Sequence, residues 1–385
     1  MSATNLERIR ADFAEDIRAS GSIKTAALVE GLATIPREDF LGPGPWRILR
    51  VADLAKGYRS TPDADPRHLC ENVLVALDEA RRLNNGEPLG LMIFLDALEL
   101  ASGERFLHIG CGVGYYTAIA AHAVGAKGSV VAVEIDKNLG ARAESNLRPY
   151  RNVRVVVGDG LAGAFGSFDA IFVNAGCTEP LPIWLDQLAI GGRLLVPLTV
   201  DLPSAPNLGA GRMLLVTRRE AGYEARFASS VGIFHCEGAR TAEGNARLEQ
   251  ALPRGDLQSV RRLRRDPHEQ GENCWLHGSA FCLESDPDSR GASRIELTVD
   301  KALLHGYVGR YQLAPALLVT ITLQGDTLFA QASGQRDFPI YPESQQKFFY
   351  KVIDAQITFV GEAGRPASSL ILHQGGRDIP AKRVD

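Results

Sequence analysis

Short apolar runs alternate with segments of helical periodicity across the middle of this chain, and no other feature constrains the fold as strongly. The apolar runs predict strands at residues 106–109, 129–133, 153–157, 170–173 and 193–197. The clearest expected helices lie between them, at residues 115–124 and 137–147. Elements in this order are typical of a parallel sheet with helices on both faces. The carboxyl ends of parallel strands share one edge, where ligands of such folds bind. The sequence therefore predicts a doubly wound α/β sheet with a ligand site at that edge.

A glycine-rich loop connects the first expected strand to the first expected helix. The stretch Leu107–Thr117 contains the pattern G-x-G-x-G, and glycines let the backbone turn tightly and let a ligand approach it closely. Dinucleotide-binding proteins use G-x-G-x-x-G, whose last glycine admits a pyrophosphate at the helix N-terminus. Here the sixth position is Tyr115, which favours a cofactor without a diphosphate, whose amino-acid tail meets the loop. An NAD-dependent oxidoreductase of similar fold stands as the alternative.

The next three strand ends each carry a polar side chain suited to a nucleoside. Glu134 follows Gly114 by 20 residues, and a carboxylate there can accept hydrogen bonds from both ribose hydroxyls. Asp159 can accept one from an adenine amino group, and Asn174 ends the fourth strand beside the expected position of a sulfonium. For His108 a buried, hydrogen-bonded imidazole is favoured over a general base. The strand ends together predict S-adenosylmethionine (SAM) as the cofactor, and its binding residues are predicted to be His108, Gly110, Cys111, Gly112, Gly114, Tyr115, Glu134, Ile135, Gly158, Asp159, Gly160 and Asn174.

The same segment resembles the protein-L-isoaspartate O-methyltransferases. The resemblance rests on the glycine loop, on residues 157–160, on residues 168–171 and on the pattern of leucines and glycines over 185–197. Residues 35–40 are similar to the N-terminal V-P-R-x-x-F element of that family, and the likeness extends over roughly residues 5 to 240. It implies a Rossmann-like methyltransferase fold, SAM as cofactor and a carboxyl group as methyl acceptor, often on a damaged aspartyl residue.

One segment departs from the family pattern. The family places a T-I-S-x-P motif over its active site, and the corresponding residues here are Asn84, Asn85, Gly86, Glu87 and Pro88. Asn84, Asn85 and Gly86 are accordingly the predicted catalytic positions, with Gly86 in place of the serine. Methyl transfer is still expected, because a carboxylate acceptor is ionised at neutral pH and needs no base. Repair of isoaspartyl residues is expected to be weak.

The predicted activity is therefore SAM-dependent O-methylation of a carboxylate in a protein or peptide. The acceptor is an isoaspartyl, aspartyl or C-terminal carboxylate, and a peptide natural product is among the candidates. Two alternatives remain open, a methyltransferase that acts on a small molecule and a non-catalytic assembly protein that keeps the SAM fold.

Periodicity and composition divide the chain into two domains. Residues 1–285 are expected to form the SAM-binding domain, with a helical part over about 1–100, and residues 286–300 have linker composition. Short strands and turns over residues 301–385 predict a small antiparallel sandwich or barrel. That segment resembles a lipocalin-like domain found behind some serine β-lactamase-type hydrolases. The resemblance implies a role in homo-oligomerisation, and presentation of the substrate is the alternative.

Charge and cysteine content exclude several classes of protein. A net charge of -4 argues against a nucleic-acid partner, and no apolar run approaches the roughly 20 residues that span a membrane. The first twenty residues lack the apolar core of a signal peptide, so a cytoplasmic protein with free thiols is expected. No C-x-x-C pair occurs, and no metal site is predicted, because metal-ligand spacing is not apparent among His68, His235, His277, His305 and His373.

Overall fold

The structure is a computed structural model. It describes residues 3–203, 205, 207–254, 257–286, 297–314, 317–333, 337–350, 355–361, 365–374 and 377–385. Most of the predicted linker, residues 287–296, lies outside the described residues. The chain divides into two compact units, residues 1–251 with 260–285 and residues 252–259 with 286–385.

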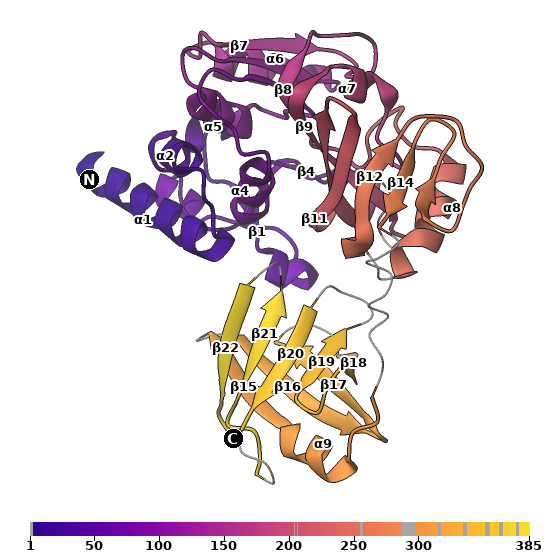
Figure 1. Ribbon diagram of the computed structural model, residues 1–385. Helices are drawn as coiled ribbons and strands as arrows, with labels where there is room; N and C mark the ends of the chain where they lie inside the picture. Colours follow the sequence, from indigo (N-terminus) through magenta and orange to yellow (C-terminus); the bar gives the residue numbers. More distant parts are fainter. Residues whose placement is uncertain are drawn as a thin grey trace. The chain divides into compact units, whose positions relative to one another are not determined.

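A long mixed sheet forms the centre of the first unit (Figure 1). Its strands lie in the order β13-β14-β12-β11-β10-β9-β8-β5-β6-β7. The parallel strands are β5 (Arg105–Ile109), β6 (Ser129–Glu134), β7 (Val153–Val157), β8 (Phe168–Val173) and β9 (Leu188–Asp201). Because β5 pairs with β6 on one side and with β8 on the other, the strand order reverses at β5, where such sheets bind ligands. The predicted Rossmann-like sheet is thus confirmed.

Helices around the parallel strands bury a common apolar core. The helices of this unit with regular α geometry are α1 (Ala3–Gly21), α2 (Ala26–Thr34), α3 (Glu38–Leu41), α4 (Pro88–Ala97), α5 (Tyr115–Val124), α6 (Lys137–Leu147), α7 (Pro182–Asp186) and α8 (Ala242–Ala251). Nearly every residue of α5 is buried, since α5 packs against both the sheet and α2. α6 begins where the Asp136 side chain accepts hydrogen bonds from two backbone N–H groups. Both helices have the bounds predicted from the sequence.

The N-terminal region is not helical throughout, as had been expected for residues 1–100. A small antiparallel sheet with the order β2-β1-β3-β4 interrupts it. Its strands are β1 (Arg47–Leu49), β2 (Arg59–Ser60), β3 (Leu74–Asp78) and β4 (Leu83–Asn84). Trp46, Ile48, Leu69, Val73 and Val75 form its own buried cluster. β1, β2 and β4 contain only two or three residues each, too few for a clear alternation of polar and apolar side chains.

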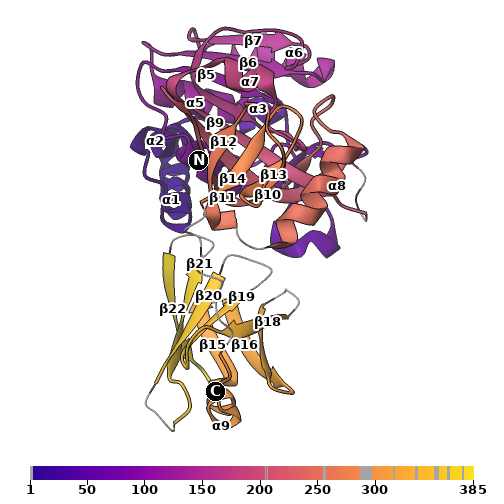
Figure 2. The same ribbon diagram turned by 45° about the vertical axis from the view of Figure 1, so that its right-hand side comes forward.

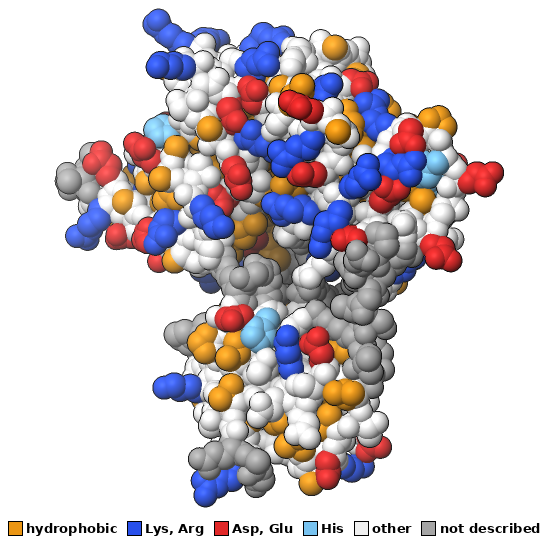
Figure 3. Space-filling view, viewed as in Figure 1, with side chains coloured by type: hydrophobic (Ala, Val, Ile, Leu, Met, Phe, Trp, Pro, Cys, Tyr) orange, Lys and Arg blue, Asp and Glu red, His pale blue; other side chains and the backbone are white. Residues whose placement is uncertain are grey.

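Antiparallel strands extend the parallel sheet beyond β9. They are β10 (Leu208–Arg219), β11 (Gly222–Phe234), β12 (Val260–Arg264), β14 (Cys282–Ser285) and, at the edge, β13 (Cys274–His277). The sequence also favours antiparallel strands at residues 213–217 and 231–234, and these segments lie within β10 and β11. On the face seen in Figure 3, basic and acidic side chains are interspersed over this unit.

The second unit contains a closed antiparallel barrel in which each strand pairs with the next and the last returns to the first. Its strands are β15 (Gly309–Ala314), β16 (Leu317–Gln324), β17 (Thr327–Ala332), β18 (Phe338–Pro342), β19 (Lys347–Tyr350), β20 (Ala355–Val360), β21 (Ser369–Gln374) and β22 (Arg377–Arg383). Helix α9 (Lys301–Tyr307) lies at one end of the barrel (Figure 2). Tyr307, Tyr311, Phe348 and Phe359 fill the interior with aromatic contacts. No helix among the described residues is long and apolar enough to span a membrane.

Candidate functional site

The loop after β5 uses its three glycines for two different purposes. Gly110, Gly112 and Gly114 all adopt positive φ, at 76°, 58° and 92°. A Cβ at Gly114 would lie 2.7 Å from Leu147 Cδ1, and one at Gly110 would lie 3.2 Å from the carbonyl oxygen of Asn174. A Cβ at Gly112 would meet no atom within 4 Å. The outer glycines therefore allow close packing, whereas Gly112 leaves the loop backbone open to a ligand.

Glu134 is held beside this loop by the backbone. It ends β6, is 7% exposed, and its Oε2 accepts a hydrogen bond from the Gly112 N–H at 2.7 Å. Its Oε1 accepts one from the Asp136 N–H at 3.0 Å. Burial raises the pKa of the Glu134 carboxyl, and these backbone hydrogen bonds oppose the rise. Each carboxylate oxygen has a second acceptor position, so Glu134 can accept further hydrogen bonds from a ligand.

The other predicted strand-end residues flank Glu134 and the glycine loop. Ile135, next in the chain, is 44% exposed and offers an apolar surface. Asp159 follows β7 within the Gly158–Gly160 turn, is exposed, and accepts a hydrogen bond from the Leu161 N–H at 2.8 Å. Asn174 follows β8 and donates from Nδ2 to the Gly110 carbonyl at 3.3 Å. The structure thus brings the ends of β5, β6, β7 and β8 together at one edge of the sheet.

Three side chains in the predicted cofactor set belong to the core instead. His108 is fully buried, its Nδ1 lies 2.9 Å from Thr117 Oγ1, and its ring stacks on Phe172. Burial lowers the pKa of His108 to about 3, so the imidazole is neutral. Tyr115 packs edge-on against Phe40, and the thiol of Cys111 is also buried. Residues 111 and 115 therefore border the site through their backbone only. The buried, hydrogen-bonded imidazole expected for His108 is confirmed, and a contact of its side chain with the cofactor stays a prediction.

Hydrogen bonds from a buried arginine hold the predicted catalytic segment, residues 84–86, in place. Arg37 is 4% exposed and donates to Asn85 Oδ1 at 2.9 Å and to the Gly86 carbonyl at 2.8 Å. The Tyr116 hydroxyl donates to the same carbonyl at 3.3 Å, which joins the segment to the first turn of α5. Asn84 Oδ1 accepts from the Gly86 N–H at 2.8 Å and stabilises the turn. The segment therefore lies beside the end of the glycine loop.

Arg37 is a functional candidate that sequence reasoning did not select. Its guanidinium also donates to the Val73 carbonyl at 3.0 Å, and its Nη1 is buried without a hydrogen-bond partner among the described residues. An arginine side chain keeps its charge at physiological pH. Arg37 thus places a positive charge behind residues 85 and 86. The signal for it was the match of residues 35–40 to the V-P-R-x-x-F element.

A second arginine ties the small sheet to the cofactor edge. Arg81, in the turn between β3 and β4, forms an ion pair with Asp136 at 2.6 Å. Asp136 lies two residues after Glu134 and caps α6. The β3–β4 turn is therefore positioned over the end of β6. This contact spans 55 residues of sequence and no local pattern indicated it.

No metal site is expected from the sequence, and that expectation stays untested, but a group of side chains of the metal-ligand type lies at the other end of the sheet. The side chains of His268, Cys274, His277 and Cys282 gather around the β13–β14 hairpin. His268 was not among the histidines weighed for metal-ligand spacing. All six cysteines are free thiols, as predicted.

Comparison with known proteins identifies two matching families. Residues 84–205 match the family described as protein-L-isoaspartate(D-aspartate) O-methyltransferase, and residues 293–382 match a domain of unknown function, DUF3471. The first match contains the predicted segment 84–86 and all four strand ends. The second includes most of the barrel unit.

Individual relatives agree with the first match. A protein-L-isoaspartate O-methyltransferase of Thermotoga maritima is 37% identical over 34% of this chain and 43% of its own length. Protein-L-isoaspartate O-methyltransferase 1 of Archaeoglobus fulgidus is 41% identical over 29% of this chain and 53% of its own. A solved protein-L-isoaspartate O-methyltransferase has a TM-score of 0.48 and 21% identity over 84% of this chain and 99% of that one. The chain spans about half the length of these two sequence relatives. Residues 84–205, which supply the glycine loop and the neighbouring strand ends, are thus similar in sequence to the protein-L-isoaspartate O-methyltransferases.

Proposed function

We propose that this protein is a SAM-dependent methyltransferase whose acceptor is a carboxylate of a protein or peptide. The observation that carries the proposal is the pairing of Glu134 with the open Gly112 backbone, inside a segment that matches the family model. A buried carboxylate beside a loop glycine that has open space around its Cα is suited to a ribose attached to a small charged tail. The NAD alternative is less well supported, because Tyr115 occupies the position where a pyrophosphate-binding loop has glycine.

The residues at the strand ends fit SAM by chemical type. Glu134 would accept hydrogen bonds from the ribose hydroxyls, Ile135 would contact the adenine face, and Asp159 would accept from the adenine amino group. The backbone N–H groups at the start of α5 would receive the carboxylate of the amino-acid tail, which the helix dipole favours. When bound, SAM supplies a methyl group activated by a positively charged sulfur.

For a carboxylate acceptor, the contribution of the protein is position and charge. The acceptor is already ionised at neutral pH, so no general base is required. Arg37 lies behind residues 85 and 86 with no carboxylate partner among the described side chains, and its charge favours an anion at this segment. Residues 84–86 would align the acceptor oxygen with the methyl carbon and exclude water.

Gly86 restricts the class of acceptor further. It has no side-chain hydroxyl to offer an isoaspartyl carboxylate, so we propose that generic isoaspartyl peptides are poor substrates. A dedicated peptide or protein, including a peptide natural product, is the preferred acceptor class. The free thiols favour a reducing compartment such as the cytoplasm. We further propose that the barrel unit is lipocalin-like and serves in self-association or in presentation of the substrate.

The cofactor assignment is tested by calorimetric titration of SAM and S-adenosylhomocysteine. Glu134→Ala removes the acceptor for two hydroxyls and is expected to weaken binding by about 2 kcal/mol, roughly 30-fold. Glu224→Gln, which changes an exposed carboxylate on β11, is the control and should bind as the wild type does. Unchanged affinity in Glu134→Ala would remove the basis of the assignment.

The acceptor is tested with SAM that carries a labelled methyl group. Isoaspartyl peptides, ordinary peptides and small carboxylic acids are offered separately, and release of label by mild base marks an ester. We expect base-labile label in a peptide or protein pool and little in the generic isoaspartyl peptide. Turnover of that peptide comparable with a repair enzyme would show that Gly86 does not limit the acceptor.

A further inference from the structure

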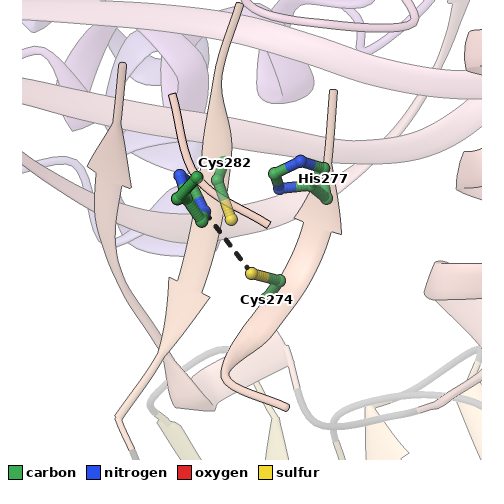
Figure 4. A group of neighbouring side chains, drawn as sticks. Cys274, His277 and Cys282 are labelled. Atoms are coloured by element: carbon green, nitrogen blue, oxygen red, sulfur yellow. Dashed lines mark hydrogen bonds between the residues drawn. The ribbon is translucent and has the colours of Figure 1, made fainter. Parts of the chain in front are cut away.

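We propose that His268, Cys274, His277 and Cys282 form a binding site for a zinc ion. One ligand atom from each residue, the sulfur of each cysteine and a ring nitrogen of each histidine, lies within 4.8 Å of the other three. Figure 4 shows the two cysteines and His277 directed toward a common centre. The site is separate from the strand ends assigned to the cofactor and goes beyond the proposed methyl transfer.

The β13–β14 hairpin brings three of the four residues to one face. His277 and Cys282 are directly opposite each other in the strand register, and the turn between them is closed by a hydrogen bond from the Gly278 N–H to the Phe281 carbonyl at 2.9 Å. In a regular strand, Cys274 and His277 would point to opposite faces. A register shift between Cys274 and Leu276 changes this alternation, and both side chains reach the same cluster.

The fourth residue comes from the preceding loop with a defined tautomer. His268 Nδ1 lies 2.8 Å from the Asp266 carbonyl oxygen, which can only accept a hydrogen bond, so Nδ1 carries the proton. The unprotonated Nε2 then faces the Cys274 sulfur at 3.6 Å. A metal-binding histidine typically donates its other ring N–H to a backbone carbonyl in this way. His268 is therefore already oriented as a ligand.

The remaining contacts also favour a metal. The Gly271 N–H donates to the Cys274 sulfur at 3.3 Å, which stabilises a thiolate. His277 Nδ1 is buried and has no hydrogen-bond partner within the described parts of the chain, an unfavourable state unless a ligand occupies it. Cys274 and Cys282 are both buried. Each observation is explained by one ion bound between the four side chains.

The donor set identifies the ion and its role. Two thiolates and two imidazoles are a usual tetrahedral set for Zn²⁺. Four protein ligands leave no position for water or substrate, so the site is structural. All four ligands lie within residues 268–282, and the ion would fasten the edge hairpin to the loop that precedes it. The spacing H-x5-C-x2-H-x4-C lacks a C-x-x-C pair, which is why a search for that pattern misses it.

The test is the metal content of the full chain, purified without a histidine tag. We expect about one zinc per chain, consistent with one four-ligand site. Cys274→Ser and Cys282→Ser should each lose most of it. Cys70→Ser removes a thiol elsewhere in the same unit and should keep it. Wild-type protein that contains no zinc and binds none when zinc is added would overturn the proposal.

Cobalt substitution keeps the test decisive if a serine variant folds poorly. Cobalt bound by the wild type and by Cys70→Ser should give the intense visible absorption of tetrahedral coordination with thiolate charge transfer. His268→Ala should weaken or abolish it while far-ultraviolet circular dichroism is retained. A disulfide between Cys274 and Cys282 in the protein isolated under reducing conditions, found by peptide mapping, would instead identify a redox pair and contradict the zinc site.

Discussion

Glu134 and His108 lie on neighbouring strands and are both largely buried, yet only one can meet a ligand. Glu134 is at the end of β6, where its oxygens contact the loop backbone and retain acceptor positions. His108 is one residue before the end of β5, and its ring is enclosed by Thr117 and Phe172. The sequence places both beside the glycine loop, but only the structure shows which way each side chain points. For these two residues, the position along the strand decides whether the side chain can contact a ligand.

Buried His108 should make stability depend on pH. Its pKa is lowered to about 3 in the folded protein, and the unfolded value is near 6.5. The stabilisation is therefore present above pH 6.5 and is lost as pH falls from 6.5 toward 3, by up to about 1.4 kcal/mol per pH unit. His108→Asn retains a partner for Thr117 and should show a shallower loss between pH 6.5 and 5.

The measurement is urea unfolding followed by tryptophan fluorescence. Trp46, Trp184 and Trp275 are the three tryptophans of the chain, and all lie in the first unit, so the signal reports that unit alone. Equal pH dependence in the wild type and in His108→Asn would show that another group controls it.

Introducing the family's serine by Gly86→Ser should destabilise the protein. Gly86 has a φ of 69°, and a Cβ there would lie 2.9 Å from Leu91 Cδ2. Gly103, at φ 91°, has no atom within 4 Å of such a Cβ, so Gly103→Ser carries the backbone strain without the contact. Both variants should lose stability, by about 1–2 kcal/mol for Gly103→Ser, and Gly86→Ser should lose more. Urea unfolding compares them, and equal losses would refute the steric argument.

At the scale of elements, the parallel strands and their helices follow from the sequence, whereas the small sheet and the β13–β14 hairpin do not. α5 and α6 have long periodic patterns with clear glycine and aspartate signals at their starts. β2 and β4 contain two residues each, which is too few for periodicity. The register shift in β13 leaves no local signal, and it places two ligand-type side chains on one face. The elements missed are therefore strands that are very short or that have an irregular register, in which too few residues repeat to give a pattern.

Replacement of Arg37 should reduce stability and methyl transfer more than replacement of an exposed arginine of the same region. Arg37 joins the start of β3 to the segment after β4 through three acceptors, so Arg37→Met leaves buried oxygens unpaired. We expect a loss of about 3 kcal/mol in unfolding free energy and a large loss of methyl transfer, with SAM affinity nearly unchanged. Arg47→Met, which removes an exposed pair with Glu79 on the small sheet, should change both little. Equal effects of the two substitutions would argue against a positioning role for Arg37.

At the scale of the whole molecule, the two units have separate apolar cores. The barrel core is formed entirely by residues between 299 and 381, and the core around α5 by residues between 13 and 233. Composition and strand spacing predicted the C-terminal β-domain, and its closed form became clear only from the pairing of β15 with β22. The predicted domain limits of 285 and 301 remain a proposal.

Removal of the barrel should leave cofactor binding intact. A chain that ends at Asp286 keeps every strand of the mixed sheet, so its affinity for S-adenosylhomocysteine should stay within about twofold of the full chain, since separate cores fold independently. The truncated chain should lose one of two properties. These are self-association, measured by light scattering, and methylation of the peptide acceptor. Truncated protein with unchanged oligomeric state and activity would leave the barrel without either role, and lost binding would place the boundary elsewhere.

The closure of the barrel also limits how this unit can join copies of the chain. An open sheet can recruit a neighbouring chain by adding its strand to an unpaired edge. β15 and β22 are paired with each other, so the barrel sheet has no such edge. Any assembly through this unit must therefore use the side chains on its outer wall and its loops. Its specificity would then be set by residue identity at the surface, which point mutations can alter one contact at a time.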